Sequence, residues 1–456
     1  MSVSEVRSAP VTPEWLLQHV EATGAADLGA GLQRLIASGA LPAGTQLPTI
    51  RDLAHSASIS VGTVLAAWNH LRDLGLIETR RRGGTIVRAG AASATTVSDW
   101  SSIDFQQGAP DVALQPELGA ALLDSITAPN LNVFGREYMT DRLLAAVSPG
   151  WPFPAEAWTT AGGGTEALLL ATAAAAGPGS IVAVDEPAGP GFLDTLRELQ
   201  LTPIAVKSDA SGPLPSSLAA AVEAGAATFV LQPGAPFAAD HALTQQRADE
   251  LAAVLCEPRF AAVLVVEDDS IGPLAADEPP TLGIRLPRRV LRVRSYCKAY
   301  GIDVRTSVLG GPQHLIDRAI ALRSHGVGSN SRILQNTLAY LIRDKDANAR
   351  VADARAHYAR RARLLADALT TKGLVVHEGV QSIVHWIEVA DETNALVRLA
   401  ARGIIAGAGS RSFVERPPHD LIRLSAMQLP ETDTDAFDRL ATAVADAARS
   451  GREFFD

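Results

Sequence analysis

Between residues 12 and 75, apolar residues recur at the three- and four-residue spacing of amphipathic helices. A short helix is expected within residues 12–22 and a longer one over Asp27–Ser38, where Gly39 and Pro42 mark the end. Thr49, with Asp52 three residues later, suits the N-cap of a third helix. A fourth helix is expected from about Ser60, with Thr63, Val64, Trp68, Leu71 and Leu74 on one face and Gly75 at its end.

Two short strand-like runs follow these helices. Ile77–Arg80 and Thr85–Arg88 flank Arg82-Gly83-Gly84, a sequence that favours a tight hairpin. Two short helices joined by a tight turn and followed by a basic hairpin predict a winged helix-turn-helix domain. We expect it to occupy residues 12–89.

The rest of the chain has a different pattern. Residues 90–102 are mostly small and polar, and they predict a linker. From Ile103 onwards, helical segments alternate with continuous apolar runs such as Ala261–Val266, a pattern typical of an α/β domain with a mainly parallel sheet. We therefore expect a second domain over residues 103–456, with a smaller α/β unit near its C-terminal end.

Charge is distributed unevenly between these regions. The whole chain of 456 residues has a net charge of −10, which argues against a surface that coats nucleic acid generally. From Asp27 to Ala89, however, seven arginines against four acids give +3. Any DNA contact should therefore come from the winged helix-turn-helix domain.

The remaining composition indicates a cytoplasmic protein. Its two cysteines, Cys256 and Cys297, provide no disulfide framework. Its start has no apolar signal-peptide core. The uncharged run Ala167–Val184 is interrupted by Gly177-Pro178-Gly179, so it predicts a helix and a strand rather than a membrane span. We expect neither a membrane partner nor a metal site.

Lys298 is the residue with the most specific candidate chemistry. It follows the apolar run Val290–Val293, so it should lie just past the end of a buried strand, where an unpaired lysine is unusual. Arg305 follows seven residues later. A lysine that forms a Schiff base, with an arginine for a phosphate, is what pyridoxal 5′-phosphate (PLP) requires. The alternative is a surface strand end with ordinary basic residues.

The N-terminal region resembles the GntR family of regulators. Its successive motifs match thirteen residues in order, which are Pro48, Arg51, Leu53, Ala54, Ser60, Thr63, Val64, Gly75, Leu76, Ile77, Gly84, Thr85 and Val87. The resemblance implies that Ser60 and Thr63 enter the major groove at the start of the recognition helix, and that Arg51 and the wing residues Arg80, Arg81 and Arg82 contact DNA. Val61 stands where the family often has arginine, so base reading there must be apolar or lost.

The larger region resembles fold-type-I aminotransferases, and the two together resemble MocR-type transcription regulators. By that resemblance, Lys298 carries PLP, Asp268 binds the pyridinium nitrogen, and Arg423 binds the carboxylate of the ligand. The implied phosphate site comprises Gly164, Thr165, Ser295 and Arg305. A structural ion pair is the alternative role of Arg423.

Three positions depart from the aminotransferase pattern. Gly189 replaces the aromatic residue that stacks on the cofactor ring, Phe237 replaces an asparagine, and Ser270 replaces a tyrosine in the cofactor site. Efficient transamination is therefore not expected, and we expect Phe237 or another aromatic residue to supply the missing packing.

The favoured hypothesis is a DNA-binding regulator that binds PLP and senses an amine or amino acid. One alternative is an active aminotransferase with an appended DNA-binding domain, and another is a regulator whose large domain is only a dimerisation scaffold. A homodimer is implied by the resemblance, and it would suit two-fold DNA half-sites.

Overall fold

The computed structural model describes residues 11–20, 24–37, 41, 44–73, 76–80, 84–87, 100–324, 326, 328–379 and 382–449. The chain divides into two compact units, one of residues 1–98 and 432–435 and the other of residues 99–431 and 436–456. The linker predicted at residues 90–102 lies mostly outside the described residues, and its last three, Trp100–Ser102, form a 3-10 turn.

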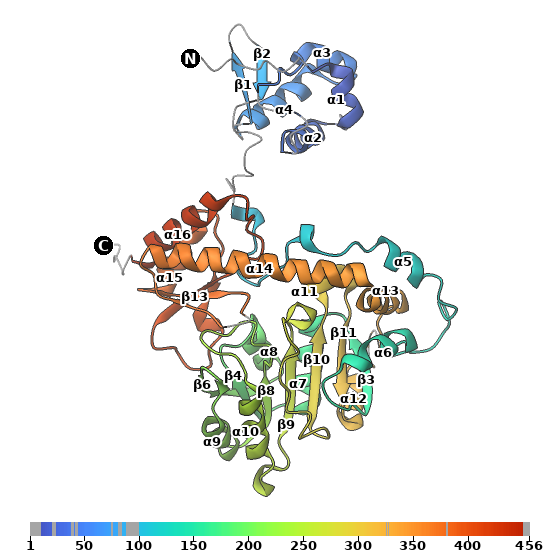
Figure 1. Ribbon diagram of the computed structural model, residues 1–456, viewed down its shortest axis with the longest axis vertical. Helices are drawn as coiled ribbons and strands as arrows, with labels where there is room; N and C mark the ends of the chain where they lie inside the picture. The colour runs from blue at the N-terminus through green and yellow to red at the C-terminus, as the bar shows by residue number, and fades with distance from the viewer. Residues whose placement is uncertain are drawn as a thin grey trace. The chain divides into compact units, whose positions relative to one another are not determined.

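In its described residues, the N-terminal unit has four helices and a hairpin, as the sequence predicts (Figure 1). These elements are α1 (Pro13–His19), α2 (Ala25–Ala37), α3 (Ile50–Ser56), α4 (Val61–Asp73), β1 (Ile77–Arg80) and β2 (Gly84–Val87). The second strand begins at Gly84, one residue earlier than expected, because Gly84 pairs with Arg80 across the hairpin. Gly75, Arg81, Arg82 and Arg88, which the predictions also used, lie outside the described residues.

Local chemistry explains where these helices begin and how closely they pack. Thr49 is the N-cap of α3, as predicted, and its Oγ1 accepts a hydrogen bond from the Asp52 amide at 3.2 Å. Gly31 weakens helix propensity, but a Cβ there would lie only 2.2 Å from Val20 Cγ1. The glycine therefore allows the end of α1 to approach α2. The shared core includes Leu28, Leu32, Ile36, Val64, Trp68 and Leu71.

The second unit is built around a seven-stranded mixed sheet (Figure 1). Its spatial order is β3 (Ala157–Ala161), β11 (Ser307–Gly311), β10 (Val290–Ser295), β9 (Leu264–Asp269), β8 (Ala226–Leu231), β4 (Ile181–Asp185) and β5 (Thr202–Val206). β11 is antiparallel to both of its neighbours, and the pairings from β10 through β5 are all parallel. The prediction of a mainly parallel sheet is confirmed.

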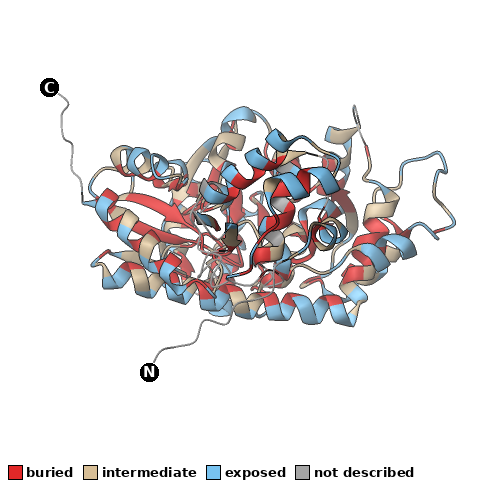
Figure 2. Ribbon diagram, turned by 90° about the horizontal axis from the view of Figure 1, so that it is seen from above, coloured by how far each residue is buried: buried red, intermediate tan, exposed pale blue. Residues whose placement is uncertain are grey.

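Helices cover both faces of this sheet. On one face the core includes residues of α7 (Gly164–Ala175), α8 (Phe192–Glu198) and α12 (Gln313–Arg323). On the other face it includes residues of α6 (Asp141–Val147), α9 (Pro215–Glu223), α10 (Gln245–Leu255) and α13 (Arg332–Arg343). Val265 and Val266 of β9 belong to opposite cores because successive side chains of a strand alternate. The strands are buried and exposed residues line the outer helix faces (Figure 2).

The C-terminal part of the second unit, called the small unit below, contains a four-stranded antiparallel sheet. One long helix joins it to the large sheet. That helix is α14 (Lys345–Thr371), which runs past the large sheet to the small one (Figure 1). The small sheet has the order β12 (Val376–His377), β13 (His385–Val389), β15 (Asp420–Leu424) and β14 (Gly407–Ala408), with α15 (Glu392–Ala400) and α16 (Thr434–Ala448) packed in its core. The other α-helices and β-strands of the described residues are α5 (Gly119–Ser125), α11 (Cys297–Tyr300), β6 (Ser208–Asp209) and β7 (Gly212–Pro213).

The bounds of β9 also differ from the sequence-based expectation. The apolar run Ala261–Val266 predicts a strand that ends before three acids, whereas β9 begins at Leu264 and includes Glu267, Asp268 and Asp269. The acids are accommodated inside the sheet because two arginines of β10 neutralise two of them. Within the described residues, no helix has the length and apolar character needed to cross a membrane.

Candidate cofactor site and nucleic-acid interface

The N-terminus of α7 forms a narrow cradle beside the end of β10. Gly163 is its N-cap, with a φ of 118° that favours glycine. A Cβ on Gly163 would lie 3.8 Å from Nη1 of Arg305 and 3.9 Å from the Cys297 sulfur, and a Cβ on Gly164 would lie 3.1 Å from Oγ of Ser295. Free helix amides, a hydroxyl and a guanidinium therefore converge where an anion such as phosphate can bind.

Of the four predicted phosphate ligands, the structure thus brings Gly164, Ser295 and Arg305 together directly. Thr165 follows in the first turn of α7 and is exposed. Arg305 is also exposed, and among the described residues its guanidinium has no carboxylate partner. An exposed cation at a helix N-terminus complements a dianionic ligand.

Lys298 lies in α11, three residues after β10 ends, as predicted. Its Nζ donates hydrogen bonds to the carbonyl oxygens of Gln107 at 3.3 Å and Gly108 at 3.1 Å. Burial lowers the pKa of Lys298, although the negative charges of Asp104, Cys297 and Asp268 act in the opposite direction. A lowered pKa increases the fraction of neutral amine, the form that attacks an aldehyde.

Asp268 is the buried acid of this site. It lies on β9, beside β10, and is 6% exposed. Among the described residues it has no ion-pair partner, and burial, reinforced by the charge of Asp269, raises its pKa to about 7. A buried carboxyl group that has no ion-pair partner among the described residues can bind a protonated ring nitrogen.

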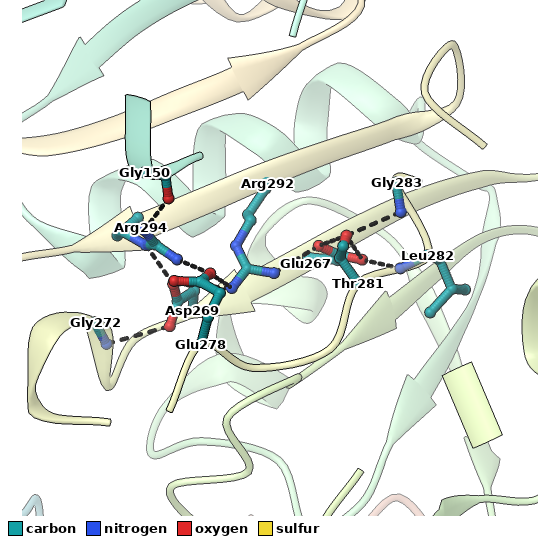
Figure 3. A network of polar contacts seen from close by, with 10 residues as sticks. All are labelled: Gly150, Glu267, Asp269, Gly272, Glu278, Thr281, Leu282, Gly283, Arg292 and Arg294. Carbon is teal, nitrogen blue, oxygen red and sulfur yellow. Dashed lines mark hydrogen bonds and ion pairs between the residues drawn. The ribbon is translucent and has the colours of Figure 1, made fainter. Parts of the chain in front are cut away.

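The two acids that flank Asp268 are used differently. Glu267 and Asp269 are fully buried, and Arg292 of β10 binds them at 2.9 and 3.1 Å (Figure 3). Arg294 binds Asp269 at 2.6 Å, and both arginines also contact Glu278. Although burial acts to raise the pKa of Asp269, the two arginines outweigh it and lower that pKa. Glu267 and Asp269 are therefore buried, ion-paired acids and not solvated ones.

Phe237 occupies the space next to Gly189. A Cβ on Gly189 would lie 3.5 Å from Cδ2 and Cε2 of the Phe237 ring. The ring centroid is 6.0 Å from Lys298 Nζ and 5.9 Å from Cζ of Arg423. An aromatic ring is therefore present beside the lysine, supplied by the loop after β8. Ser270 follows Asp268 closely, and its buried hydroxyl acts to lower the pKa of Asp268, against the larger effect of burial.

Arg423 is buried on β15, in the small unit. It is 4% exposed, and it donates from Nε to the Gln106 carbonyl at 2.9 Å and from Nη1 to Ser412 Oγ at 2.8 Å. Burial lowers its pKa to about 10. No carboxylate within the described residues pairs with it, which argues against the alternative of a structural ion pair. A cavity of about 510 Å³ is lined by Arg423 together with Thr165, Gln106 and Gln107.

The N-terminal unit presents the residues predicted to contact DNA. Arg51 is exposed in the first turn of α3. Ser60 precedes α4, where its Oγ accepts from the Thr63 amide at 3.0 Å and lies 2.8 Å from Thr63 Oγ1. Ser60 and Thr63 therefore lie together at the start of the expected recognition helix. Of the wing arginines, Arg81 and Arg82 lie outside the described residues, and the side chain of Arg80 is not described either.

The exposed face of α4 is partly apolar. Val61 is 52% exposed and Leu65 is 42% exposed, one helical turn apart. Exposed aliphatic side chains at the start of a recognition helix can contact the methyl group of thymine. Val61 is therefore accessible to an apolar base contact, and the choice between apolar base reading and its loss stays a prediction.

Sequence reasoning missed several groups around the candidate cofactor site. They are the carbonyl oxygens of Gln106, Gln107 and Gly108, the hydroxyl of Ser412, and the indole of Trp386, which lies 5.4 Å from Cζ of Arg423. Backbone carbonyls carry no sequence signal. The Gln106–Arg423 contact also joins residues 317 positions apart.

Two family models match separate parts of this chain. Residues 25–87 match the bacterial regulatory proteins of the gntR family, and residues 262–440 match aminotransferase class I and II. The first match covers the described helices α2–α4 and the hairpin. The second covers Asp268, Lys298, Arg305 and Arg423.

Similar proteins include transcription regulators. The vitamin B6 salvage pathway transcriptional repressor PtsJ of Salmonella typhimurium is 25% identical over 425 residues, which cover 89% of this chain and 95% of PtsJ. The HTH-type transcriptional regulator Rv1152 of Mycobacterium tuberculosis is 44% identical over 52 residues, which cover 11% of this chain and 43% of Rv1152.

Solved aminotransferase structures share the fold of the large unit. The aspartate aminotransferase of Thermus thermophilus with maleate superimposes with a TM-score of 0.63 at 21% identity, over 75% of this chain and 92% of that one. An archaeal alanine:glyoxylate aminotransferase gives a TM-score of 0.66 at 15% identity, over 75% and 90% of the two chains. These similarities establish a fold-type-I aminotransferase fold.

Proposed function

Because the chain joins a GntR-family helix-turn-helix domain to an aminotransferase class I and II domain, the architecture of MocR-type regulators, we propose that it is a transcription regulator that senses an amine or amino acid through bound PLP. One observation carries the sensing part of this proposal. Asp268 and Arg423 are buried charged groups near Lys298, and neither has an ion-pair partner among the described residues.

The residues present fit PLP. The cradle of Gly163, Gly164, Ser295 and Arg305 suits a phosphate, the unpaired carboxyl group of Asp268 suits a pyridinium nitrogen, and Lys298 offers an amine. When bound, PLP supplies an aldehyde and an electron-withdrawing ring for reaction with amines. Phe237 would pack against that ring, and Arg423 would orient a ligand carboxylate. Its guanidinium is held in place by Ser412 and Gln106.

The DNA-binding part predicts a salt-dependent interaction in which Arg51 is a main cation. We expect Arg51→Ala to weaken binding to a duplex and to lower the slope of log affinity against log salt by about one. The fold should be retained because Arg51 is exposed. Fluorescence anisotropy with a labelled duplex over a salt series measures both quantities.

A matched control is Arg72→Ala, since Arg72 is an exposed arginine in the last turn of α4. Equal affinities and slopes for the two variants would contradict the assignment of Arg51. A combined substitution of Arg80, Arg81 and Arg82 by alanine should reduce the slope further.

The second prediction is that the aminotransferase unit responds to ligands without sustained turnover. Gly189, Phe237 and Ser270 change the groups that would hold a reacting ring to within a fraction of an ångström. We expect amino acids to alter the visible absorption of the PLP-loaded protein and its DNA affinity, with no accumulation of keto product. Arg423→Gln should lose the response to amino acids and keep the response to amines that lack a carboxylate.

The outcome distinguishes the three hypotheses. Repeated turnover to keto product would favour an active aminotransferase. If ligands that change the visible absorption leave the DNA affinity unchanged, the sensor hypothesis would be contradicted. A wild-type protein that binds no PLP would favour the dimerisation scaffold.

We also propose a homodimer. Five large apolar residues between positions 122 and 134 are exposed, and Phe134 is fully so; they are Leu122, Leu123, Ile126, Val133 and Phe134. Arg332 holds this loop by hydrogen bonds to the carbonyl oxygens of Val133 and Gly135 at 2.9 and 3.0 Å. A fixed, exposed apolar loop is suited to contact with a second copy of the chain.

A DNA partner and two free thiols further favour a cytoplasmic location.

A further inference from the structure

A short segment that follows the predicted linker contacts both Lys298 and Arg423, the two cations proposed to bind the amine and the carboxylate of the effector. We call Asp104–Gly108 the strap. Its Gln106 carbonyl accepts from Arg423 at 2.9 Å, and its Gln107 and Gly108 carbonyls accept from Lys298 at 3.3 and 3.1 Å. The strap therefore supplies oxygen atoms to the groups expected to bind a carboxylate and an amine.

The strap is anchored in the small unit on both sides. Phe105 is fully buried in the core of that unit, and its carbonyl accepts from the Ser425 amide at 2.9 Å. Gln428 accepts from the Asp104 amide at 2.8 Å and donates to the Pro110 carbonyl at 3.3 Å. With both ends fixed, the carbonyl groups between them are held toward Arg423 and Lys298.

Asp104 determines the shape of the strap. Its Oδ1 accepts hydrogen bonds from the amides of Gln106 at 2.8 Å and Gln107 at 2.9 Å. These two bonds close a turn of the Asx type, which leaves the carbonyl groups free to bond elsewhere. Its negative charge also acts on both cations, since it favours the charged forms of Lys298 and Arg423.

We infer that Asp104 is a positioning residue that holds the strap as an internal competitor of the effector for Arg423. This inference rests on the proposed function, in which Arg423 binds the effector carboxylate. A carboxylate that takes two donors of the guanidinium from the Nε side must displace the Gln106 carbonyl. Asp104 therefore opposes effector binding by fixing that carbonyl and by repelling a second anion.

The covalent connection gives the competition a consequence for regulation. Trp100 precedes the strap by four residues, and its ring lies 5.8 Å from that of Phe105. Trp100 is one of the last three residues of the predicted linker to the DNA-binding domain. Displacement of the strap by an effector would thus act directly on the end of this linker. The size of this shift is set by the difference between the effector's affinities for the protein with the strap in place and with the strap displaced.

The test measures the affinity of three proteins for maleate, a carboxylate probe without an amine. Asp104→Ala removes both the turn and the charge, whereas Asp104→Asn keeps an oxygen for the two amides and removes the charge. We expect maleate to bind Asp104→Ala about tenfold more tightly than it binds the wild type, because one charged hydrogen bond no longer competes with it. The gain in affinity should be smaller for Asp104→Asn. Isothermal titration calorimetry measures these affinities with or without PLP.

Asp209→Ala is the matched control, because Asp209 caps the Ser211 amide at 2.9 Å in the turn between β6 and β7. It should leave maleate affinity unchanged. In the wild type, maleate should accelerate hydrogen exchange of the Gln106 and Gln107 amides, as Asp104→Ala does without maleate.

The sign of the change separates competition from a structural role. A residue that only supports the site would weaken maleate binding when replaced, so equal or weaker binding by Asp104→Ala would overturn the inference. Undiminished maleate binding by Arg423→Gln would overturn both the strap and the carboxylate site. Failure of the wild type to bind PLP would instead refute only the cofactor proposal, because the calorimetry does not depend on it.

Discussion

Replacement of Lys298 by alanine is expected to abolish the covalent attachment of PLP. Lys298 Nζ lies beside the Phe237 ring and close enough to Asp268 for the two charges to influence each other, and its lowered pKa favours the reactive neutral amine. The Asp268 carboxyl and the cradle at α7 would remain, so residual noncovalent binding can persist. The visible absorption of a lysine-linked cofactor should disappear entirely.

The measurement is borohydride reduction of the PLP-loaded protein followed by peptide mass mapping. The wild type should carry a pyridoxyl group on the peptide that contains Lys298, and Lys298→Ala should carry none. Lys207→Ala provides the control, because Lys207 is exposed at the end of β5. A label on any other lysine, or a label retained by Lys298→Ala, would show the cofactor assignment to be wrong.

The largest expected effect on stability comes from Arg292→Leu. Arg292 is fully buried and contacts the carboxylates of Glu267, Asp269 and Glu278 (Figure 3). Leucine would leave Glu267 without its cation in the core and Asp269 with only Arg294. Removal of one partner from a buried ion pair typically costs about 3–5 kcal/mol, because the remaining charge stays desolvated. The free energy of unfolding should fall by that amount.

Arg288→Leu gives a matched comparison. Arg288 has an 87% exposed side chain and lies 4.0 Å from Glu156, a surface pair worth at most about 1 kcal/mol. Urea unfolding of both variants, followed by a probe of the aminotransferase unit, measures the difference. Similar losses from the two substitutions would mean that the buried network contributes little.

Much of the fold follows from local patterns in the chain. Helical spacing and caps predicted the helices of the N-terminal unit, because Leu28, Leu32 and Ile36 must share one face whatever they pack against. Thr49 caps the start of α3 by accepting a hydrogen bond from the amide of Asp52, which is only three residues away in the sequence. Alternating helices and apolar strands likewise predicted the α/β domain, and the position of Lys298 after β10 required only the end of an apolar run.

The assignment of Asp268, by contrast, required both motif and tertiary structure. The sequence alone does not distinguish three consecutive acids by their chemistry. Strand alternation places Asp268 on the opposite face from its two neighbours, but it does not show on which face the carboxylates are paired with cations. Arg292 and Arg294 decide that, because the parallel register of β9 and β10 places them beside Glu267 and Asp269.

Only the tertiary structure placed Phe237 and the strap. Phe237 was named as a departure from a pattern, but its contact with the space beside Gly189 depends on the loop after β8. The hydrogen bonds of Gln106, Gln107 and Gly108 use backbone carbonyls, which every residue has, and their donors lie 190 or more positions away. Local sequence determines which helices and strands form. Contacts between distant backbone and side-chain groups are selected only when those elements pack, since the energy of a hydrogen bond depends on the distance and orientation of its two groups in space and not on their separation along the chain.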